Sequence, residues 1–288
     1  MYHPHRRRLA TTMIAALSAL LMISGETPAA SAAPNGPIVL FGDSMWSNGT
    51  GTFPSKMAEL NQGPGKVGGN APAQGRCKRG EARVGASLQR QTGVPVEDYA
   101  CNGAVAYAPA NGVNNVSAQI RRARAQGNLN PSTRAVFLNI GMLDNLWAPG
   151  LPATQTKNFV AAMRPEIDRI KRSAPNAKIA FVGYPHMVDH IGQGCWLHVG
   201  ALDRIAMPVP PLRMALDASH HWQRQAARAT GIGWIDMEAA TRSNGTCASP
   251  DKRYVSGLID QTSRPYNMTT HLTDVGNEGV AGVLSRHI

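Results

Sequence analysis

The amino-acid sequence predicts an α/β protein in which a parallel sheet is covered by helices on both faces. Short apolar runs alternate with segments of helical periodicity through most of the chain, and this is the pattern of strands joined by right-handed helical crossovers. Polar stretches follow three of the apolar runs, beginning at Gly42, Cys101 and Gly141. Functional sites in parallel sheets form at the carboxyl ends of strands, so the position of these stretches supports the same fold class.

Each predicted strand is an apolar run that is too short for a helix of ordinary length. These runs occupy residues 38–41, 94–100, 135–140, 177–182 and 232–235. Helices are predicted where apolar residues recur at intervals of three and four positions. These segments are residues 52–60, 81–91, 116–125, 157–173, 212–230 and 273–285. Residues 63–75, which are rich in Gly, Pro and Asn, are predicted to form a loop, and residues 185–211 a long excursion from the sheet.

The first 32 residues have the organisation of a signal peptide. A basic segment from Arg6 to Arg8 precedes an uncharged apolar run from Leu9 to Ile23, and an Ala-x-Ala cleavage site ends at Ala32. The apolar run is shorter than the ~20 residues that cross a bilayer as a helix. We therefore predict cleavage near Ala32 and secretion of the mature protein, with a retained membrane anchor as the alternative.

Residues 33–288 are expected to form a single domain, since the sequence contains no internal repeat and no low-complexity linker. Removal of residues 1–32, which hold three arginines and one glutamate, lowers the formal net charge from +11 to +9. A basic surface attracts anionic partners, and for an exported protein we expect a cell-envelope surface rather than nucleic acid. The sequence has neither zinc-finger spacing nor interleaved aromatic and basic residues.

Four cysteines in an exported chain indicate two disulfides. They allow three pairings, and we predict Cys77–Cys101 and Cys195–Cys247 because each of these bonds closes one excursion from the core. Metal ligation is the alternative, but no two cysteines have the Cys-x-x-Cys spacing of common zinc sites.

The first polar stretch is suited to presenting the hydroxyl of Ser44 where a strand ends. A serine hydroxyl becomes a nucleophile when a neighbouring base removes its proton. The free N–H groups of a following helix N-terminus favour the negative charge that then develops. An ordinary turn is the alternative interpretation, because Gly-Asp-Ser is also common turn chemistry.

The candidate base is His271, which immediately precedes the predicted C-terminal helix. His186 follows a predicted strand and is the competing candidate, whereas His220 and His221 lie within a helical pattern and are interpreted as surface or packing residues. N–H donors must also surround the developing oxyanion, each worth ~3 kcal/mol. Gly103, which has no side chain, and the carboxamide of Asn145 are the candidates on the other two polar stretches.

Four blocks of the sequence resemble the GDSL family, also called SGNH hydrolases. They are FGDSMWSNG, DYACNGAVA, LNIGMLDN and HLTDVG, and they occur in the family's order over most of residues 33–288. The segment FVGYPHM is similar to one found in secreted bacterial members. The resemblance implies a flavodoxin-like, three-layer α/β/α fold with a central parallel sheet of about five strands. It also implies ester hydrolysis by Ser44 and His271 without a metal or an organic cofactor, with the N–H groups of Ser44 and Gly103 and an asparagine side chain around the oxyanion.

The third block departs from the family pattern. Ungapped alignment places Leu143 on the family asparagine and Asp144 on the family aspartate, so that Asn145 serves only if the loop is shifted. Among the nearby asparagines, Asn145 is favoured over Asn139 because Asn139 lies inside a predicted strand.

The last block departs as well, because Met268 occupies the position three residues before the histidine where the family usually has aspartate. An imidazole base needs an acceptor that holds its tautomer and stabilises its charged form. That acceptor is either a backbone carbonyl, which gives a Ser-His dyad, or another carboxylate, with Asp274 and Asp260 as candidates.

We expect a secreted carboxylester hydrolase of the esterase or lipase type that forms an acyl-enzyme on Ser44, with His271 as base. The partner is then an ester substrate, such as a lipid or an acylated glycan. An acyltransferase that moves an acyl group to or from envelope glycans or glycolipids would use the same site, provided that the cleft excludes water. A non-catalytic, basic protein that binds the envelope is the third hypothesis.

Overall fold

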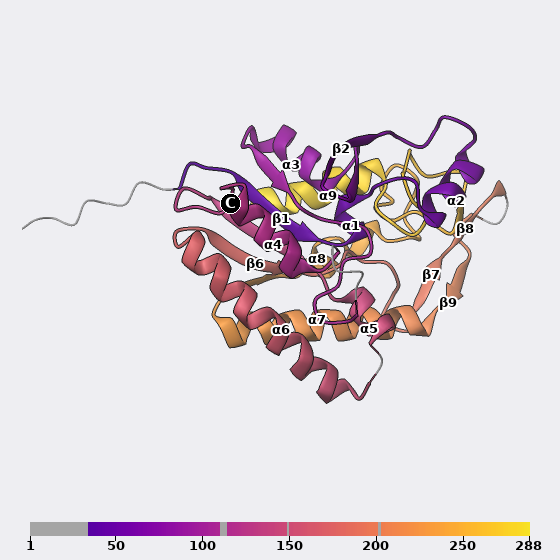
Figure 1. Ribbon diagram of the computed structural model, residues 1–288. Helices are drawn as coiled ribbons and strands as arrows, with labels where there is room; N and C mark the ends of the chain where they lie inside the picture. Colours follow the sequence, from indigo (N-terminus) through magenta and orange to yellow (C-terminus); the bar gives the residue numbers. More distant parts are fainter. Residues whose placement is uncertain (1–33, 110–113, 149, 201–202) are drawn as a thin grey trace, which may run out of the picture. The chain divides into compact units, whose positions relative to one another are not determined.

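A five-stranded parallel sheet organises the part of the chain that the computed structural model describes, residues 34–109, 114–148, 150–200 and 203–288 (Figure 1). The predicted signal peptide lies outside these residues. The strands have the spatial order β10-β6-β5-β1-β4, and every neighbouring pair is parallel. Their bounds are β1 Ile38–Gly42, β4 Val96–Asp98, β5 Ala135–Asn139, β6 Lys178–Val182 and β10 Gly233–Ile235.

The sheet confirms the predicted fold class. Numbered along the chain, its five strands follow the order 2-1-3-4-5, which is the flavodoxin-like arrangement. The register pairs Gly42 of β1 with Asn139 of β5, so these two strands end level with each other. From β1 the chain adds β4 on one side, and it then adds β5, β6 and β10 on the other side. The boundary between β1 and β5 is therefore the topological switch point of the sheet, and the residues that follow these two strands meet there.

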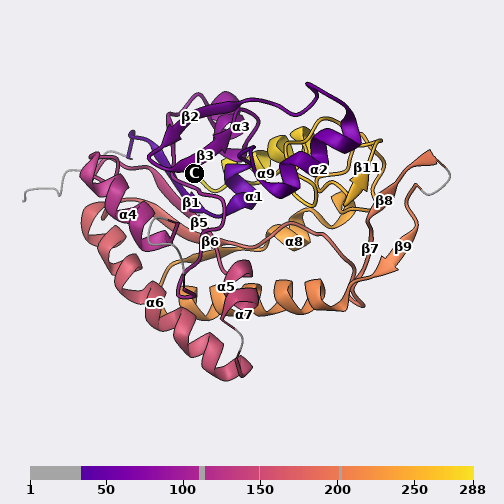
Figure 2. The ribbon, with the colours of Figure 1, turned by 45° about the vertical axis from the view of Figure 1, so that its right-hand side comes forward.

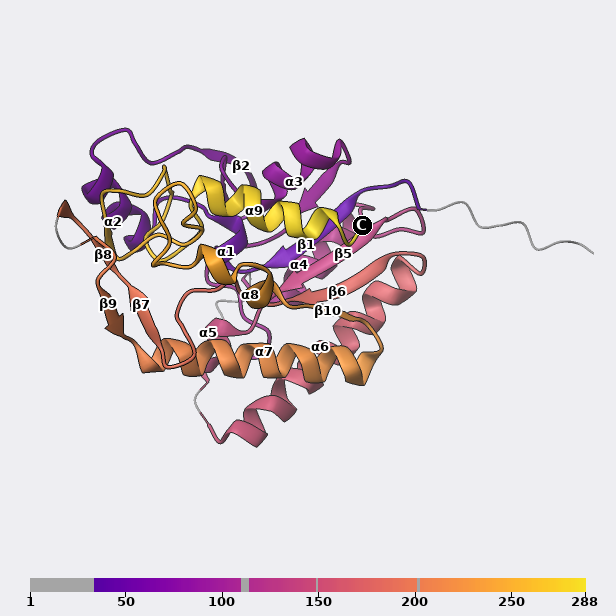
Figure 3. The same ribbon diagram turned by 180° about the vertical axis from the view of Figure 1, so that it is seen from behind.

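Helices cover both faces of the sheet, as Figures 1 and 3 show. The first face carries α3 (Val84–Thr92) and α9 (Asp274–Ser285), and the second carries α4 (Val116–Ala125), α6 (Pro152–Ser173) and α7 (Pro210–Thr230). Alternate residues of β1 enter two separate cores, Ile38 and Leu40 in one and Val39 and Phe41 in the other. Successive strand residues point to opposite faces, so burial of both faces explains the uninterrupted apolar run.

Short helices follow the strands at the switch point. Helix α1 (Ser44–Ser47) begins two residues after β1, and α5 (Met142–Trp147) begins soon after β5. Further helices in the described part of the chain include α2 (Phe53–Gln62), α8 (Met237–Ala240) and the 3₁₀ helix η2 (Arg242–Asn244). All six predicted helices are present, although α6 begins at Pro152 rather than at residue 157. Proline is favoured in the first turn of a helix, where its missing N–H has no partner to lose.

Two segments that the sequence predicts to be irregular contain strands (Figure 2). The hairpin of β2 (Asn70–Gln74) and β3 (Cys77–Gly80) lies partly in the predicted loop over residues 63–75. The excursion over residues 185–211 contains β7 (Gln193–Cys195), β8 (Leu197–His198) and β9 (Ala206–Pro208), with β7 antiparallel to β9 and β8 parallel to β11 (Ile259–Asp260). Most of these strands lack apolar alternation, so their sequences gave no period-two signal.

Both predicted disulfides are present, Cys77–Cys101 and Cys195–Cys247, and no cysteine is left free for metal ligation. The first bond joins β3 to the segment after β4. The N–H of Cys101 also donates to the carbonyl oxygen of Gly42 (3.0 Å), so this segment is fixed beside the end of β1. None of the described helices has the length and apolarity required to cross a membrane.

Candidate active site

The end of β1 and the N-terminus of α1 present the hydroxyl of Ser44. Asp43 caps α1 by accepting a hydrogen bond from the N–H of Met45 (2.9 Å). The side-chain amide of Gln119 accepts from the N–H of Gly42 (3.0 Å) and donates to its carbonyl oxygen (2.8 Å). A Cβ atom on Gly42 would lie 2.9 Å from a carbonyl oxygen of β5, so glycine is required for the close approach of the two strands. Buried polar contacts therefore fix the backbone on which Ser44 stands.

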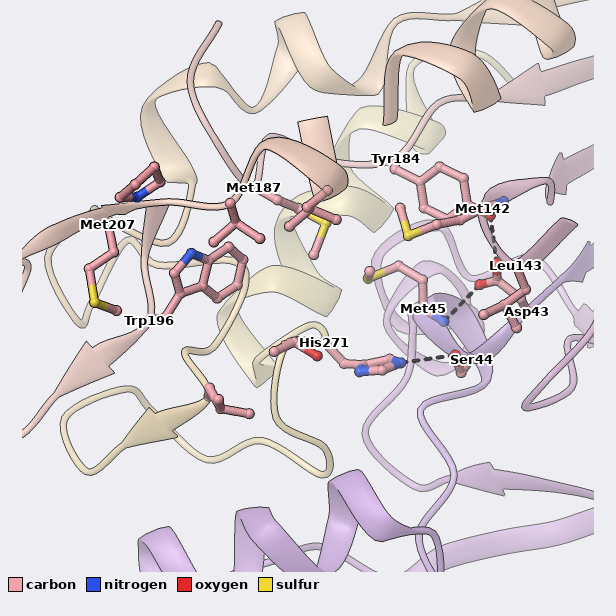
Figure 4. A pocket seen from close by; sticks show the side chains of 15 residues that line it. Asp43, Ser44, Met45, Met142, Leu143, Tyr184, Met187, Trp196, Met207 and His271 are labelled. Atoms are coloured by element: carbon pink, nitrogen blue, oxygen red, sulfur yellow. Dashed lines mark hydrogen bonds between the residues drawn. The ribbon is translucent and has the colours of Figure 1, made fainter. Parts of the chain in front are cut away.

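The imidazole of His271 reaches this hydroxyl from the loop before α9 (Figure 4). Its Nε2 lies 2.9 Å from Ser44 Oγ, although 227 positions separate the two residues. Its Nδ1 lies 2.9 Å from the carbonyl oxygen of Thr269. Because a carbonyl oxygen can only accept, Nδ1 is assigned the proton and Nε2 is left to accept from the serine hydroxyl. A general base needs this tautomer in order to take the serine proton.

The acceptor that orients His271 is a backbone carbonyl, that of Thr269, as in a Ser-His dyad. Neither candidate carboxylate contacts the ring. Asp260 is buried against Arg253, whose Nη1 lies 3.3 Å from each of its carboxylate oxygens, and it also accepts from the N–H of Gly257 (2.9 Å). Asp274 is the first residue of α9, and both ring nitrogens of His271 already have other partners. The structure therefore contradicts Asp274 and Asp260 as orienting acceptors, because Nδ1 of the ring donates to the carbonyl oxygen of Thr269 instead.

Burial lowers the pKa of His271 below the ordinary histidine value, and the hydrogen bond to Thr269 opposes this decrease. Desolvation disfavours the imidazolium form, whereas a carbonyl acceptor favours it. No charged side chain among the described residues contributes to the shift. The ring is consequently neutral at neutral pH, which is the form that can accept a proton.

Two backbone N–H groups have no hydrogen-bond acceptor within the described residues, that of Ser44 itself and that of Gly103, on the loop after β4. Gly103 has a φ of +76°, which glycine adopts without strain. Its neighbour Asn102 accepts a hydrogen bond from Ser47 Oγ (2.5 Å) and so holds this loop against α1. Unpaired N–H groups in such a place are suited to stabilising an oxyanion.

Asp144 holds the chain that follows Gly103 and has a structural role that the sequence analysis did not assign. Its buried carboxylate accepts from the N–H groups of Ala106 (2.8 Å), Tyr107 (2.7 Å) and Ala108 (2.8 Å). Burial raises the pKa of Asp144, and these three bonds oppose the increase. The alignment of Asp144 with the family aspartate was the available signal, but its backbone partners could not be inferred from sequence.

Asn145 does not line the cavity at Ser44, which contradicts its predicted role. It lines a different pocket, against α6 and α7, whereas Leu143 lines the cavity at Ser44. Helical residues two positions apart point in nearly opposite directions, so Asn145 faces away once Leu143 faces Ser44. The loop shift that would have brought Asn145 to the oxyanion is therefore absent.

Tyr184, from the Gly-Tyr-Pro segment after β6, joins the two short helices at the switch point. Its hydroxyl donates to Asp43 Oδ2 (2.5 Å) and accepts from the N–H of Met142 (3.1 Å). Burial raises the pKa of Asp43 to about 6, and it raises the pKa of Tyr184 well above its usual range. The phenol is thus a permanent donor that ties α5 to the nucleophile turn, a role that the sequence analysis missed.

His186 and His220 do not line the cavity at Ser44. His186, the competing base, lies 3.8 Å from Glu238 and lines a separate polar pocket. His220 is buried, as expected of a packing residue, but it also accepts from the backbone N–H of Tyr184 (2.8 Å) and faces Glu238 through Nδ1 (3.2 Å). His220 therefore supports the Gly-Tyr-Pro segment from behind.

A largely apolar cavity of about 530 Å³ extends from Ser44 and His271 (Figure 4). Its walls include four methionines, Met45, Met142, Met187 and Met207. Figure 4 shows Met207 at the end of the cavity away from Ser44, beside Trp196. The polar groups Asp43 and Tyr184 satisfy each other, so the walls offer few polar partners to a ligand. No cluster of His, Cys, Asp or Glu among the described residues could hold a metal ion.

We predict that Asp144→Asn lowers the free energy of unfolding by about 2 kcal/mol, since an amide NH₂ would face three N–H donors and leave at least one of them unpaired. Urea denaturation of the mature protein measures this change. Asp168→Asn on the exposed face of α6 is the matched control and should alter stability by less than about 0.5 kcal/mol. Equal stability of the two variants would contradict the role given to Asp144.

Comparisons with known proteins show the family of the chain and support its fold. Residues 40–278 match the model of the GDSL-like Lipase/Acylhydrolase family. The chain is 24% identical to Lipase 2 of Streptomyces coelicolor, over 90% of both chains. Its fold is similar to phospholipase A1 from Streptomyces albidoflavus (TM-score 0.54) and to an extracellular lipase from Streptomyces rimosus (TM-score 0.55), each 19% identical, with 88% of this chain and 100% of the other covered. Because the family match spans most of its length, this chain belongs to the GDSL-like lipase/acylhydrolase family and is a carboxylic ester hydrolase.

Proposed function

We propose that the protein is an exported hydrolase that cleaves esters of apolar acids through an acyl-enzyme on Ser44, with His271 as general base. The contact of 2.9 Å between Ser44 Oγ and His271 Nε2, at the end of a largely apolar cavity, is the observation that carries this proposal. Ser44 is then the nucleophile, His271 is a base in the correct tautomer, and the cavity has room for an acyl chain.

In the first half-reaction, His271 Nε2 takes the proton of Ser44 while Oγ attacks the ester carbonyl carbon. The oxyanion accepts hydrogen bonds from the N–H groups of Ser44 and Gly103, and the new imidazolium is stabilised through Nδ1–H by the carbonyl oxygen of Thr269. Collapse of the tetrahedral intermediate expels the alcohol, which receives the proton from Nε2. In the second half-reaction, His271 Nε2 takes a proton from water while the water oxygen attacks the acyl-enzyme. Collapse of the second tetrahedral intermediate breaks the bond to Ser44 Oγ, which receives that proton from Nε2, and the acid is released.

The oxyanion site differs from the family pattern in its third donor. Leu143 occupies the position of the asparagine and lines the cavity at Ser44, so stabilisation of the oxyanion depends on the two backbone N–H groups. Loss of one side-chain donor weakens transition-state stabilisation by ~3 kcal/mol in other serine hydrolases. Leu143 instead adds apolar contact next to the reacting carbonyl, which favours substrates with an apolar acyl group.

The proposed export is supported by three observations. The signal-peptide pattern over residues 1–32 predicts cleavage near Ala32. Two disulfides suit an oxidising compartment outside the cytoplasm. The structurally similar lipase from Streptomyces rimosus is described as extracellular.

Ser44→Ala is expected to reduce hydrolysis of a short-chain ester such as p-nitrophenyl butyrate by at least about 10⁴-fold, because the acyl-enzyme cannot form. His271→Gln should have a comparable effect. Initial rates measure turnover of the ester. Intact mass after treatment with a fluorophosphonate probe measures covalent modification of the serine. Ser132→Ala, at an exposed serine in the loop before β5, is the control that should retain the probe adduct. Wild-type rates in the Ser44 variant would refute the assignment.

The acid limb of the kcat/KM profile is expected to have an apparent pKa below 6.5, since burial lowers the pKa of His271 and its neutral form persists to lower pH. Activity is lost as the pH falls through this value, because the protonated ring cannot accept from Ser44. Asp43, with a pKa raised to about 6, titrates in the same region. The limb should persist in Asp43→Asn if His271 causes it, and a limb above pH 6.5 would contradict the desolvated base.

We expect kcat/KM for p-nitrophenyl esters to rise roughly two- to fourfold per acyl methylene until the cavity is filled, since each buried methylene contributes ~0.8 kcal/mol at most. Leu212→Trp obstructs the cavity and should lower the ratio of decanoate to butyrate activity at least about tenfold. Met214→Trp is the matched control, because Met214 lies on the same helix, is exposed and does not line this cavity. A ratio that is unchanged in Leu212→Trp would place the acyl chain elsewhere.

A further inference from the structure

Thr270 lies in the sequence between the Thr269 carbonyl group and His271, and it has an unusual backbone conformation. Thr270 has a φ of +61°, and only two other non-glycine residues in the described part of the chain have a positive φ, Asn48 and Arg204. Asparagine is enriched in this left-handed region, whereas a β-branched residue is a genuine outlier there. Such outliers persist only where the surrounding structure imposes them, and they concentrate at functional sites.

The side chain of Thr270 contacts the same atom as the catalytic ring. Thr270 Oγ1 donates to the carbonyl oxygen of Thr269 at 2.6 Å, and His271 Nδ1 donates to that oxygen at 2.9 Å. A carbonyl oxygen has two lone pairs, so it can accept both bonds at once. The hydroxyl therefore fixes the direction of the oxygen on which the orientation of His271 depends.

Hydrogen bonds on both sides hold the backbone in this conformation. The N–H of Thr269 donates to Pro54 (3.2 Å), and the N–H of Thr270 donates to Gly257 (3.3 Å). The carbonyl oxygen of His271 accepts from the N–H of Ser256 (3.0 Å). Three consecutive residues are thus anchored to neighbouring segments. The left-handed turn at Thr270 reverses the chain between them and brings the carbonyl of residue 269 to the ring of residue 271.

We propose that Thr270 is a positioning residue of the dyad, whose left-handed backbone and hydroxyl together aim the Thr269 carbonyl at His271 Nδ1. This unit substitutes for a carboxylate, because Met268 stands where the family usually has the orienting aspartate. A neutral carbonyl attracts the imidazolium less strongly than a carboxylate does, so its contribution depends more on alignment. The hydroxyl supplies that alignment and offsets part of the backbone strain.

The inference rests on the proposed function of His271 as base, and two substitutions separate the hydroxyl from the rest of the side chain. Thr270→Ala keeps Cβ and removes the hydroxyl, and Thr270→Ser keeps the hydroxyl and removes the methyl group. The matched control is Thr156→Ala on α6, a half-buried threonine whose hydroxyl also donates to a backbone carbonyl (2.8 Å). Thermal unfolding of each mature variant first shows that it is folded. Should Thr270→Ala fail to fold, Thr270→Gly takes its place, since glycine adopts this φ without strain.

We expect Thr270→Ala to lower kcat for p-nitrophenyl butyrate roughly five- to tenfold, the effect of one lost hydrogen bond, with KM changed less than about twofold. The acid limb of kcat/KM should move to lower pH, because a misaligned acceptor favours the imidazolium less. Thr270→Ser should stay within about twofold of the wild-type kcat, and Thr156→Ala should match the wild type.

Proton NMR of protein labelled with ¹⁵N-histidine gives a second readout that requires no turnover. The Nδ1–H signal of His271, assigned by its absence in His271→Gln, should move upfield or broaden by exchange in Thr270→Ala and remain in Thr270→Ser. A folded Thr270→Ala with wild-type kcat, acid limb and Nδ1–H signal would overturn the inference. So would a Thr270→Ser variant as impaired as Thr270→Ala. If the wild-type protein itself hydrolyses no ester, the proposed function fails, and the NMR comparison still decides the role of Thr270.

Discussion

The hydrogen bond between Ser44 and His271 depends on two parts of the chain that are held independently. Parallel pairing of β1 with β4 and β5 fixes the strand that leads to Ser44. The side-chain amide of Gln119 hydrogen-bonds both the N–H and the carbonyl oxygen of Gly42, the last residue of this strand. The loop of His271 is anchored instead to α2 and to the segment around Gly257. A serine and an imidazole that had to find each other by side-chain motion would lose rotamer entropy, whereas these two meet already oriented.

Buried polar groups do most of the positioning around this contact. Asp43, Asp144 and Tyr184 are removed from water, which raises the pKa of each, and every one of them bonds to backbone N–H groups or to another member of the set. Burial of a carboxylate is costly unless its acceptors are filled, so the loops that carry the matching N–H groups are held in one arrangement. Because any other arrangement would leave a buried carboxylate without donors, the loops at the switch point are held rigidly.

The site combines few polar groups with a large apolar cavity. The dyad has a carbonyl in place of a carboxylate, and Leu143 takes the place of a third oxyanion donor. Under the proposed function, both changes would reduce electrostatic stabilisation of the transition state. In the same proposal, the cavity lined by methionines and Trp196 would supply binding energy from an apolar acyl chain instead. Such energy accelerates a reaction to the extent that it is realised in the transition state. Methionine side chains adapt to chains of different shape, which suits a site of this kind.

The sequence alone predicted the α/β class and the six main helices, because hydrophobic periodicity is a property of neighbouring residues. It also predicted both disulfide pairs, from the cysteine positions, and the proximity of Ser44 and His271, from their motifs at the ends of predicted elements. It did not determine the short strands β2, β7, β8 and β9, whose residues show little alternation and which form through pairing with remote segments. Asn145, Asp260 and Asp274 were wrong for a related reason. Which way a side chain points, and which carbonyl lies within reach of a ring, depends on helix phase and chain reversal in three dimensions. Only the tertiary structure could therefore place Leu143 rather than Asn145 at the cavity, and choose a backbone carbonyl, that of Thr269, over the two candidate carboxylates.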